Sequence, residues 1–390
     1  MDIHNYKRQY ERQIELLKED ENILQVNKDF ALNFKDYLIS EGIGLAKIGR
    51  YLLDVRKFSK ILNKPFDEAD KGDIRHVIAE IEQSGLAPET KKCFKVMTRK
   101  LYRFIRDIDE KGVYPEEVRW ISIGIPKNQN KLPEELLTEE EIKSIIRNCK
   151  TLRDKTLVST LAESGCRISE IGTMRLKHVS FEEYGARITV NGKTGMRKIL
   201  LINSTPYLQQ WVNEHPKNDN LDECVWYNPQ GDFLTYHAIM KIIKQAAKSA
   251  GIKKRVYAHL FRHSKATQMA SQMSEASMKQ YFGWGQDSKM CGIYIHMSGE
   301  AMDKAILKAN GIEVKEEKKE KQLKEKICLR CKTKNGVTNR CCYHCGLVLD
   351  EEFAREKIEE DLERQRADKI MNDLMKDTDV LELIKKKLAC

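Results

Sequence analysis

The sequence predicts a mainly α-helical fold with a small antiparallel β-sheet, and three patterns carry that prediction. Apolar residues recur at helical spacing over most of the chain, as in Phe30, Phe34 and Leu38. Residues 186–202 change to a period of two around a glycine-containing loop, which is typical of a β-hairpin. Five cysteines gather within residues 328–345, which indicates a small metal-binding module.

The composition limits the class of protein. The 390 residues are 41% hydrophobic, which excludes a largely disordered chain, and the length suggests two or three domains. Lys plus Arg is 69 and Asp plus Glu is 59, a net charge of +10 that is compatible with a polyanionic partner. Charges of both signs are interspersed, however, which is more typical of solvated helix faces.

The sequence also indicates where the protein resides. No apolar run approaches the roughly 20 residues of a membrane span, and the first residues lack the apolar core of a signal peptide. The 11 cysteines are an odd number, and six are scattered singly, which favours one metal site over a disulfide framework. We therefore expect a cytoplasmic protein.

A helical N-terminal domain is predicted over residues 1–112. Residues 1–24 carry one apolar stripe at helical spacing and are expected to pack on their own domain, with a dimerising arm as the alternative. Further helices are expected at about 46–62, 74–83 and 88–108, because glycines, prolines and aspartates separate these segments.

The last of these helices carries a row of cations spaced by four residues. They are Lys91, Lys95, Arg99 and Arg103. Like charges at this spacing repel by about 0.2–0.5 kcal/mol per pair, and DNA phosphates would relieve the repulsion. A solvated basic face is the alternative explanation for the row.

A linker and a second domain follow. Residues 113–133 lose helical period and contain three prolines, so they are predicted to be an interdomain linker. Thr138 and Glu141 have the spacing of a capping box, which marks the first helix of a domain over residues 134–312. That domain is expected to be mostly helical, with the hairpin as its small sheet.

The C-terminal part is expected to be modular. Residues 313–326 form a mixed-charge tether, residues 327–349 hold the clustered cysteines, and residues 350–390 are a helical tail. The tail carries a narrow apolar stripe of Ala354, Ile358, Leu362, Ile370 and Leu374. Docking on the same chain and docking on a neighbouring copy both remain open for this stripe.

Two segments combine groups that suit chemistry at an anion. Arg167 stands at a helix start, where its fork of donors can grip a phosphate, and Glu170 lies one turn further on. His259 and Arg262 are three residues apart and share a helix face, an arrangement that suits proton transfer beside an anion. Taken singly, such groups are more often structural.

A third segment contains Tyr294, ten residues after Trp284. A tyrosine in an apolar stretch is by default a core residue with a satisfied hydroxyl. Its interpretation changes when all the segments are considered together with Lys193 on the hairpin loop.

Together these residues resemble the tyrosine recombinase (phage integrase) family. The overall character of the sequence resembles that of archaeal integrases. The G-x-R-x-S-E motif of the family is matched by Gly165, Arg167, Ser169 and Glu170, and its H-x-x-R-H box by His259, Arg262 and His263. Its hairpin lysine, late glycine element and nucleophile fall on Lys193, Gly283-Trp284 and Tyr294, with Trp284 in place of the commoner histidine. Order and spacing agree over about 134–305, and residues 25–112 look like the family's core-binding domain.

The resemblance implies a site-specific DNA recombinase that works through a covalent 3′-phosphotyrosyl intermediate. Arg167 and Arg262 would donate to the non-bridging phosphate oxygens, with His259 or the indole N–H of Trp284 at the remaining positions. Tyr294 would be the nucleophile, and His259 the acceptor of its proton.

The resemblance also implies a proton donor for the leaving group and residues that hold the catalytic side chains in place. Lys193 would protonate the leaving 5′ oxygen, while Glu170 and His263 would support the catalytic groups. No cofactor is implied for catalysis, no acidic metal cluster is visible in the sequence, and cleavage is expected to persist in EDTA.

The implied partner is double-stranded DNA with a specific target site, bound by a tetramer on two sites in integration, excision or dimer resolution. Association with the nucleoid is expected. Two other functions remain open: a non-enzymatic DNA-binding protein on an integrase scaffold, and a monomeric type IB topoisomerase. Relaxation of supercoils without strand exchange would distinguish the topoisomerase.

The clustered cysteines predict a structural zinc site. Cys328 and Cys331 are one pair and Cys342 and Cys345 the other, with ten residues between the pairs. Four thiolates at this spacing suit tetrahedral Zn²⁺ with Zn–S of about 2.3 Å, and they leave no open position for catalysis. The segment resembles zinc ribbons, with Cys341 as a register alternative to Cys342 and His344 as a substitute ligand.

Overall fold

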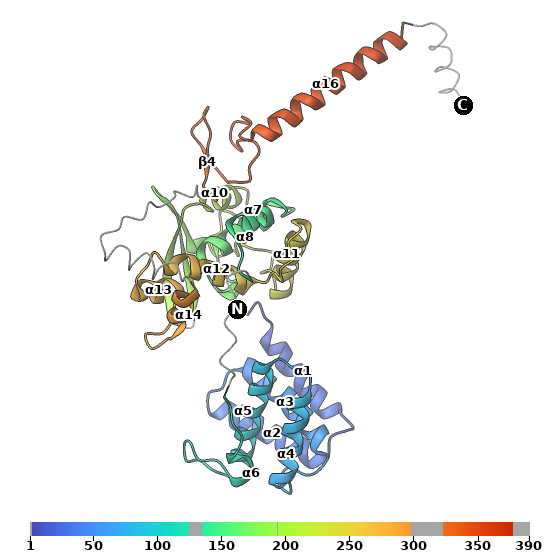
Figure 1. Ribbon diagram of the computed structural model, residues 1–390, viewed down its shortest axis with the longest axis vertical. Coiled ribbons are helices and arrows are strands. Elements are labelled where there is room, and N and C mark those ends of the chain that lie inside the picture. The colour runs from blue at the N-terminus through green and yellow to red at the C-terminus, as the bar shows by residue number, and fades with distance from the viewer. Residues whose placement is uncertain (1, 125–134, 193, 298–322, 377–390) are drawn as a thin grey trace, which may run out of the picture. The chain divides into compact units, whose positions relative to one another are not determined.

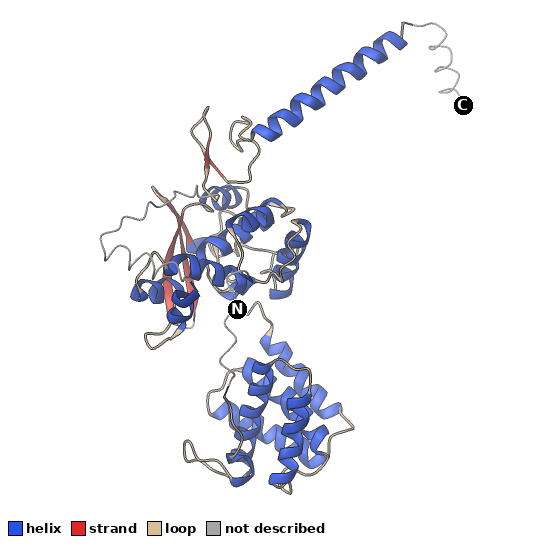
Figure 2. Ribbon diagram, in the orientation of Figure 1, coloured by secondary structure: helices blue, strands red, loops and turns tan. Residues whose placement is uncertain are grey.

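The computed structural model describes residues 2–124, 135–192, 194–297 and 323–376, and the chain divides into two compact units, residues 1–131 and 132–390 (Figure 1). Helices predominate, and the described strands lie in the second unit (Figure 2). The mainly helical fold with small antiparallel sheets that the sequence predicts is confirmed. None of the described helices is both long and apolar enough to span a bilayer.

The first unit is a helical bundle. Its helices are α1 (Tyr6–Glu19), α2 (Gln25–Ser40), α3 (Leu45–Leu62), α4 (Lys71–Gln83), α5 (Pro88–Ile105) and α6 (Glu116–Arg119). Asp70 begins α4 with a capping box to Asp73, and Pro88 occupies the first turn of α5, where a missing N–H costs nothing.

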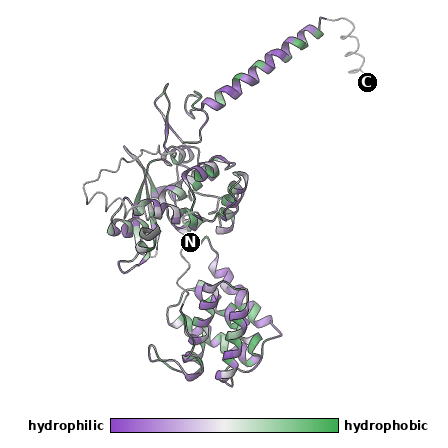
Figure 3. Ribbon diagram, viewed as in Figure 1, coloured by the Kyte–Doolittle hydropathy of each residue, from purple (hydrophilic) through white to green (hydrophobic). Residues whose placement is uncertain are grey.

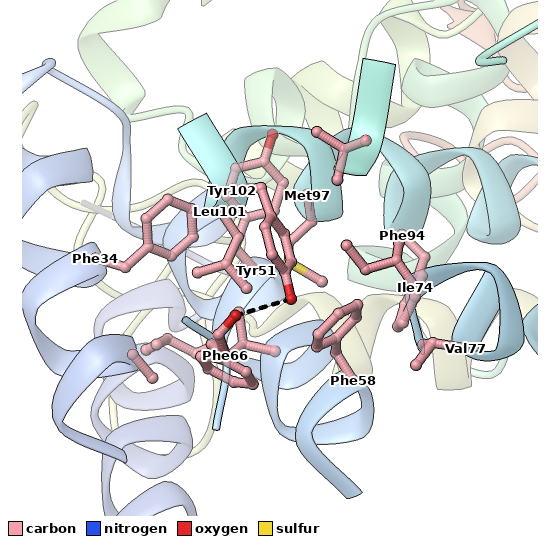
Figure 4. Close-up of a cluster of buried hydrophobic side chains, with 14 of the residues drawn as sticks. Phe34, Tyr51, Phe58, Phe66, Ile74, Val77, Phe94, Met97, Leu101 and Tyr102 are labelled. Atoms are coloured by element: carbon pink, nitrogen blue, oxygen red, sulfur yellow. Dashed lines mark hydrogen bonds between the residues drawn. The ribbon is translucent and has the colours of Figure 1, made fainter. Parts of the chain in front are cut away.

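Aromatic rings fill the core of this bundle (Figure 4). Phe58 packs edge-on against Phe66 and Tyr102, with ring centroids 5.7 and 6.0 Å apart. The hydroxyl of Tyr102 donates to the carbonyl of Phe66 over 3.2 Å, so the one polar atom of this buried ring is satisfied.

The structure shortens the predicted linker of 113–133 at its first end. Val118 in α6 and Ile121 just after it are buried in the core of the first unit, and Tyr114 packs against that core. Two apolar residues three apart are enough to dock a single helical turn. The later part of the predicted linker, residues 125–134, lies outside the described residues.

The second unit combines helices with a three-stranded sheet in its described part. Its elements up to Met297 are α7 (Glu139–Arg147), α8 (Leu152–Ser164), α9 (Ile168–Gly172), the 3₁₀ turn Leu176–His178, β1 (Val179–Glu182), β2 (Gly185–Gly192), β3 (Gly195–Leu201), α10 (Thr205–Asn213), α11 (Tyr236–Ser249), α12 (Ala258–Ala270), α13 (Glu275–Phe282) and α14 (Met290–Met297). The predicted capping box of Thr138 and Glu141 begins α7.

The sheet has the order β1-β2-β3, and both pairings are antiparallel. Gly192 pairs with Gly195, the last pair of the predicted hairpin. The sequence analysis did not predict β1, because this strand has only four residues, mostly exposed, and its alternation of Val179 and Phe181 with polar residues is too short to stand out. The predicted helix at 300–309 lies outside the described residues.

The C-terminal elements are β4 (Lys326–Ile327), β5 (Lys334–Asn335) and α16 (Glu351–Leu374). None of the residues described in α16 is buried, and its surface is mainly hydrophilic with separate apolar positions (Figure 3). Ile358 and Ile370 of the predicted stripe are 60% and 61% exposed. The described part of the chain does not cover this stripe.

Candidate active site

Arg262 is a buried cation held between two helix ends. It lies in α12 with 2% of its surface exposed, and it donates to the carbonyl of Gly165 over 3.0 Å and to that of Phe282 over 2.6 Å. Burial lowers the pKa of Arg262 to about 10, and the positive charge of Arg167 is the second cause of this shift. The guanidinium therefore stays protonated at neutral pH in a fixed orientation.

Arg167 lies beside Arg262 and is more accessible. Its Nη1 donates to Oε1 of Glu170 over 2.9 Å, and its Nη2 lies 3.4 Å from the carbonyl of Gly283. The two arginines are thus anchored on the consecutive carbonyls of residues 282 and 283, where α13 ends. The side chain of Arg167 is 28% exposed, so it can meet a ligand from solvent.

Arg197 in β3 completes this cluster, and sequence reasoning missed it. Its Nη1 and Nη2 donate to the two carboxylate oxygens of Glu170 over 3.0 and 2.8 Å, and its Nε donates to the carbonyl of Tyr281 over 2.8 Å. Burial alone would raise the pKa of Glu170, but hydrogen bonds from Arg197 and Arg167 outweigh it and lower the pKa to about 2. One carboxylate therefore ties the hairpin to the first arginine motif.

Two glycines make this close approach feasible. A Cβ at Gly192 would collide with Oε1 of Glu170. Gly283 ends α13 with φ of +59°, a left-handed conformation that favours glycine, and a Cβ there would lie 2.9 Å from Nη1 of Arg197 and 3.1 Å from Oγ1 of Thr194. Lys193 itself lies outside the described residues, but both of its neighbours pack against this cluster.

Tyr294 in α14 faces α12 from a buried position. Its hydroxyl lies 2.7 Å from Nδ1 of His263, and its ring is stacked on Trp284 with centroids 5.5 Å apart and an interplanar angle of 3°. Trp284 stacks in turn on Phe282 at 4.9 Å. The phenol is 1% exposed, and burial raises its pKa although the charge of Arg262 opposes that effect.

The phenol contacts a different histidine from the one that the sequence predicts as its proton acceptor. It is hydrogen-bonded to His263, for which the sequence predicts a supporting role, and the predicted role of His259 stays a prediction. His263 lies one helical turn beyond His259, and their rings are edge-on at 5.1 Å. His259 is exposed to solvent.

The cation row of α5 is engaged within its own unit. Lys95 forms an ion pair of 2.5 Å with Glu82, and Lys91 donates to the backbone carbonyl of that residue. Arg99 lies 3.6 Å above the ring of Tyr114, and Arg103 donates to the carbonyls of residues 108–110. These contacts relieve the repulsion on which the DNA assignment was based, so that assignment stays a prediction.

The four predicted zinc ligands converge. One sulfur from each of Cys328, Cys331, Cys342 and Cys345 lies within 4.8 Å of the others. Cys341 instead forms a β-bridge with Val348, which favours the register with Cys342 as the ligand. Four thiol sulfurs in this arrangement fit a tetrahedral zinc ion and leave no position for a substrate.

Comparisons with known proteins identify relatives of this chain. Residues 135–300 match the model of the phage integrase family. The chain is 25% identical to tyrosine recombinase XerA of Pyrococcus horikoshii over 302 residues, which cover 76% of this chain and 98% of that protein. It is 23% identical to tyrosine recombinase XerD of Bifidobacterium longum over 292 residues, which cover 69% of this chain and 92% of that protein.

Solved structures share the fold. The structure of XerH site-specific recombinase bound to palindromic difH substrate in a post-cleavage complex matches with a TM-score of 0.56 and 20% identity, over 79% of this chain and 97% of that chain. A lambda integrase dimer bound to a COC′ core site matches with a TM-score of 0.55 and 14% identity, over 68% of this chain and 76% of that chain.

Proposed function

This chain belongs to the phage integrase family through residues 135–300, and on that premise we propose that it is a site-specific DNA recombinase that cleaves and rejoins DNA through Tyr294. The observation that carries the proposal is the convergence of two arginines with a phenol in one small volume. Arg167 and Arg262 share the end of α13, and Trp284, two residues beyond Phe282, stacks on Tyr294.

The two arginines suit a phosphodiester under attack. Negative charge builds up on the non-bridging oxygens in the pentacoordinate state, and guanidinium forks donate to such oxygens in pairs. Arg262 is already oriented by two carbonyls, so little reorganisation is needed when the phosphate binds. The exposed His259 is placed to add a further donor.

The covalent step transfers one proton at each end. The phenolic oxygen of Tyr294 attacks phosphorus, and its proton passes to Nδ1 of His263, which accepts when this histidine carries its own proton on Nε2. The bond to the 5′ oxygen breaks, and Lys193 supplies the proton that this oxygen needs. Attack by a 5′-hydroxyl on the phosphotyrosyl bond reverses both transfers and rejoins the strand.

At 1% exposure the phenol cannot meet a phosphodiester while Trp284 and His263 cover it. Binding of DNA must therefore open this side of α14 before cleavage. The groups that act on phosphate belong to the protein, and the proposed steps require no cofactor.

We assign the partner as double-stranded DNA with a specific target site, held by a tetramer on two sites. Similar structures support this, since they include XerH bound to difH substrate and a lambda integrase tetramer bound to a Holliday junction. The helical first unit and the catalytic second unit would together clamp duplex DNA from opposite sides. The cysteine module, defined as residues 327–349, would hold structural Zn²⁺ through Cys328, Cys331, Cys342 and Cys345.

A supercoiled plasmid with two copies of the target site tests the proposal. The site itself is found by mapping where the protein becomes covalently attached to element or genomic DNA. We expect resolved or inverted products in the presence of EDTA, and none with Tyr294→Phe. Relaxation without strand exchange would indicate a topoisomerase, and specific binding without any cleavage would indicate a non-enzymatic scaffold.

A further inference from the structure

The spacer between the two cysteine pairs contacts the catalytic part of the chain. Gly336 lies flat against the ring of Tyr207 in α10, so closely that a Cβ at position 336 would collide with three carbons of that ring. Tyr207 is 1% exposed. Only glycine fits here, which gives this residue of the spacer a packing role.

Polar contacts complete the same interface. The hydroxyl of Tyr207 accepts a hydrogen bond from the backbone N–H of Thr338 over 2.7 Å, and it lies 2.6 Å from the hydroxyl of that threonine. Val337, the residue between Gly336 and Thr338, is 6% exposed, and Thr338 is 8% exposed. Buried polar atoms that satisfy each other across an interface are costly to separate, because each would lose its partner.

The segment that contacts Tyr207 is also tied to the cysteine cluster. Asn335, which is fully buried, donates to the carbonyl of Thr333 over 2.9 Å, and its Nδ2 lies 3.6 Å from the sulfur of Cys342. Its side-chain oxygen accepts from the N–H of Tyr343 over 3.0 Å. The position of Gly336 therefore depends on the arrangement of the cysteines.

On the other side, Tyr207 is tied to the helix that leads to the active site. Its backbone carbonyl lies 3.2 Å from the hydroxyl of Thr156 in α8, which also donates to the carbonyl of Leu152. That helix ends at Ser164, and the carbonyl of the next residue, Gly165, holds Arg262. The cysteine module thus docks on elements of the catalytic fold.

We propose that zinc binding folds the cysteine module and thereby docks it on α10 as a fixed part of the catalytic domain. The proposal rests on the assignment of the four cysteines as a zinc site. A module this small cannot bury enough apolar surface to fold alone, so its docking face forms only with the metal. Because coupling is reciprocal, docking on Tyr207 must in turn raise the affinity for zinc.

The test uses the full chain and compares zinc affinities by competition with a chromogenic chelator. Gly336→Ala and Tyr207→Phe should each weaken zinc binding by about tenfold, as expected for a coupling of ordinary size. Leu329→Ala, a change in the module at a residue that is 81% exposed, is the matched control and should bind zinc like the wild type. Hydrogen exchange of residues 205–213 should quicken in Gly336→Ala and in zinc-free wild-type protein.

Each contrary result has its own meaning. If the wild type binds no zinc, the metal site and its docking role both fail. If zinc binds equally well to wild type, Gly336→Ala and Tyr207→Phe, and exchange in α10 does not respond to the metal, zinc-dependent docking is wrong although the metal site stands. Neither result depends on DNA cleavage, so each is distinguishable from a failure of the recombinase assignment.

Discussion

The hydroxyl of Tyr294 lies 2.7 Å from Nδ1 of His263 in the same chain. The neighbouring residue Arg262 is fixed by the carbonyls of Gly165 and Phe282. The proposed nucleophile, proton acceptor and phosphate-binding arginine lie together within one chain, so the proposal includes cleavage in cis.

Complementation tests this arrangement. A mixture of Tyr294→Phe and Arg262→Ala proteins should form no covalent complex with a target duplex, because neither chain holds both groups. Each variant mixed with wild type serves as the control for assembly. Recovery of adducts in the double-variant mixture would mean that the phenol acts in a neighbouring subunit's site.

His263→Gln should slow cleavage by about 10²–10⁴-fold, the usual contribution of a general base. The pH profile is the sharper measurement. Burial raises the pKa of Tyr294 above its ordinary value of 10.0, so without a proton acceptor the rate should rise with pH throughout the range from 6 to 9. With the proton acceptor present, the rate of the wild type should depend less on pH over this range, and an unchanged profile in the variant would contradict the assignment.

Arg197→Met should reduce cleavage by about 100-fold without loss of DNA binding, because misplacement of a catalytic group by about 1 Å has this effect. Arg197 holds strand β3 on Glu170, so we expect its loss to act through the hairpin whose loop carries Lys193 in the sequence.

A substrate with sulfur at the bridging 5′ position identifies which group has moved. A thiolate leaves without a proton, so this substrate should restore cleavage by Lys193→Ala and equally by Arg197→Met, but not by Arg167→Ala. If the sulfur substrate does not restore cleavage by Arg197→Met, we would infer that this substitution acts by displacing Arg167 instead.

The Glu170 carboxylate should contribute acid-sensitive stability. Its pKa falls from 4.5 to about 2 on folding, so the contribution is complete above about pH 4.5 and is lost as the pH falls toward 2. A shift of this size corresponds to at most about 3 kcal/mol. Denaturant unfolding of wild type and Glu170→Gln should differ most at pH 6 and converge near pH 2, and a difference that does not vary with pH would be inconsistent with this explanation.

Local patterns predicted much of this molecule. Apolar periodicity located most of the helices of the first unit, and the hairpin was recognisable because a glycine-containing segment separates two stretches of alternating residues. The motif residues around Arg167 and Arg262 could be recognised because their spacing is short and fixed, and the structure brings these two residues together.

Tertiary pairings could not be predicted in this way. Arg197 belongs to no local pattern, and its partner Glu170 is 27 residues away. The roles of His259 and His263 depend on where α14 docks, and the cations of α5 find acceptors in Glu82 and in the residues after that helix. The contact between Gly336 and Tyr207 joins segments more than a hundred residues apart, so no spacing rule indicates it.

Covalent capture tests the central claim most directly. A target duplex nicked beside the cleavage position releases a short fragment after attack and traps the enzyme on DNA. In the presence of EDTA, we predict a DNA adduct whose proteolytic peptide carries the nucleotide on Tyr294, and no adduct with Tyr294→Phe. An adduct that persists in Tyr294→Phe, or that maps to a different residue, would contradict the account.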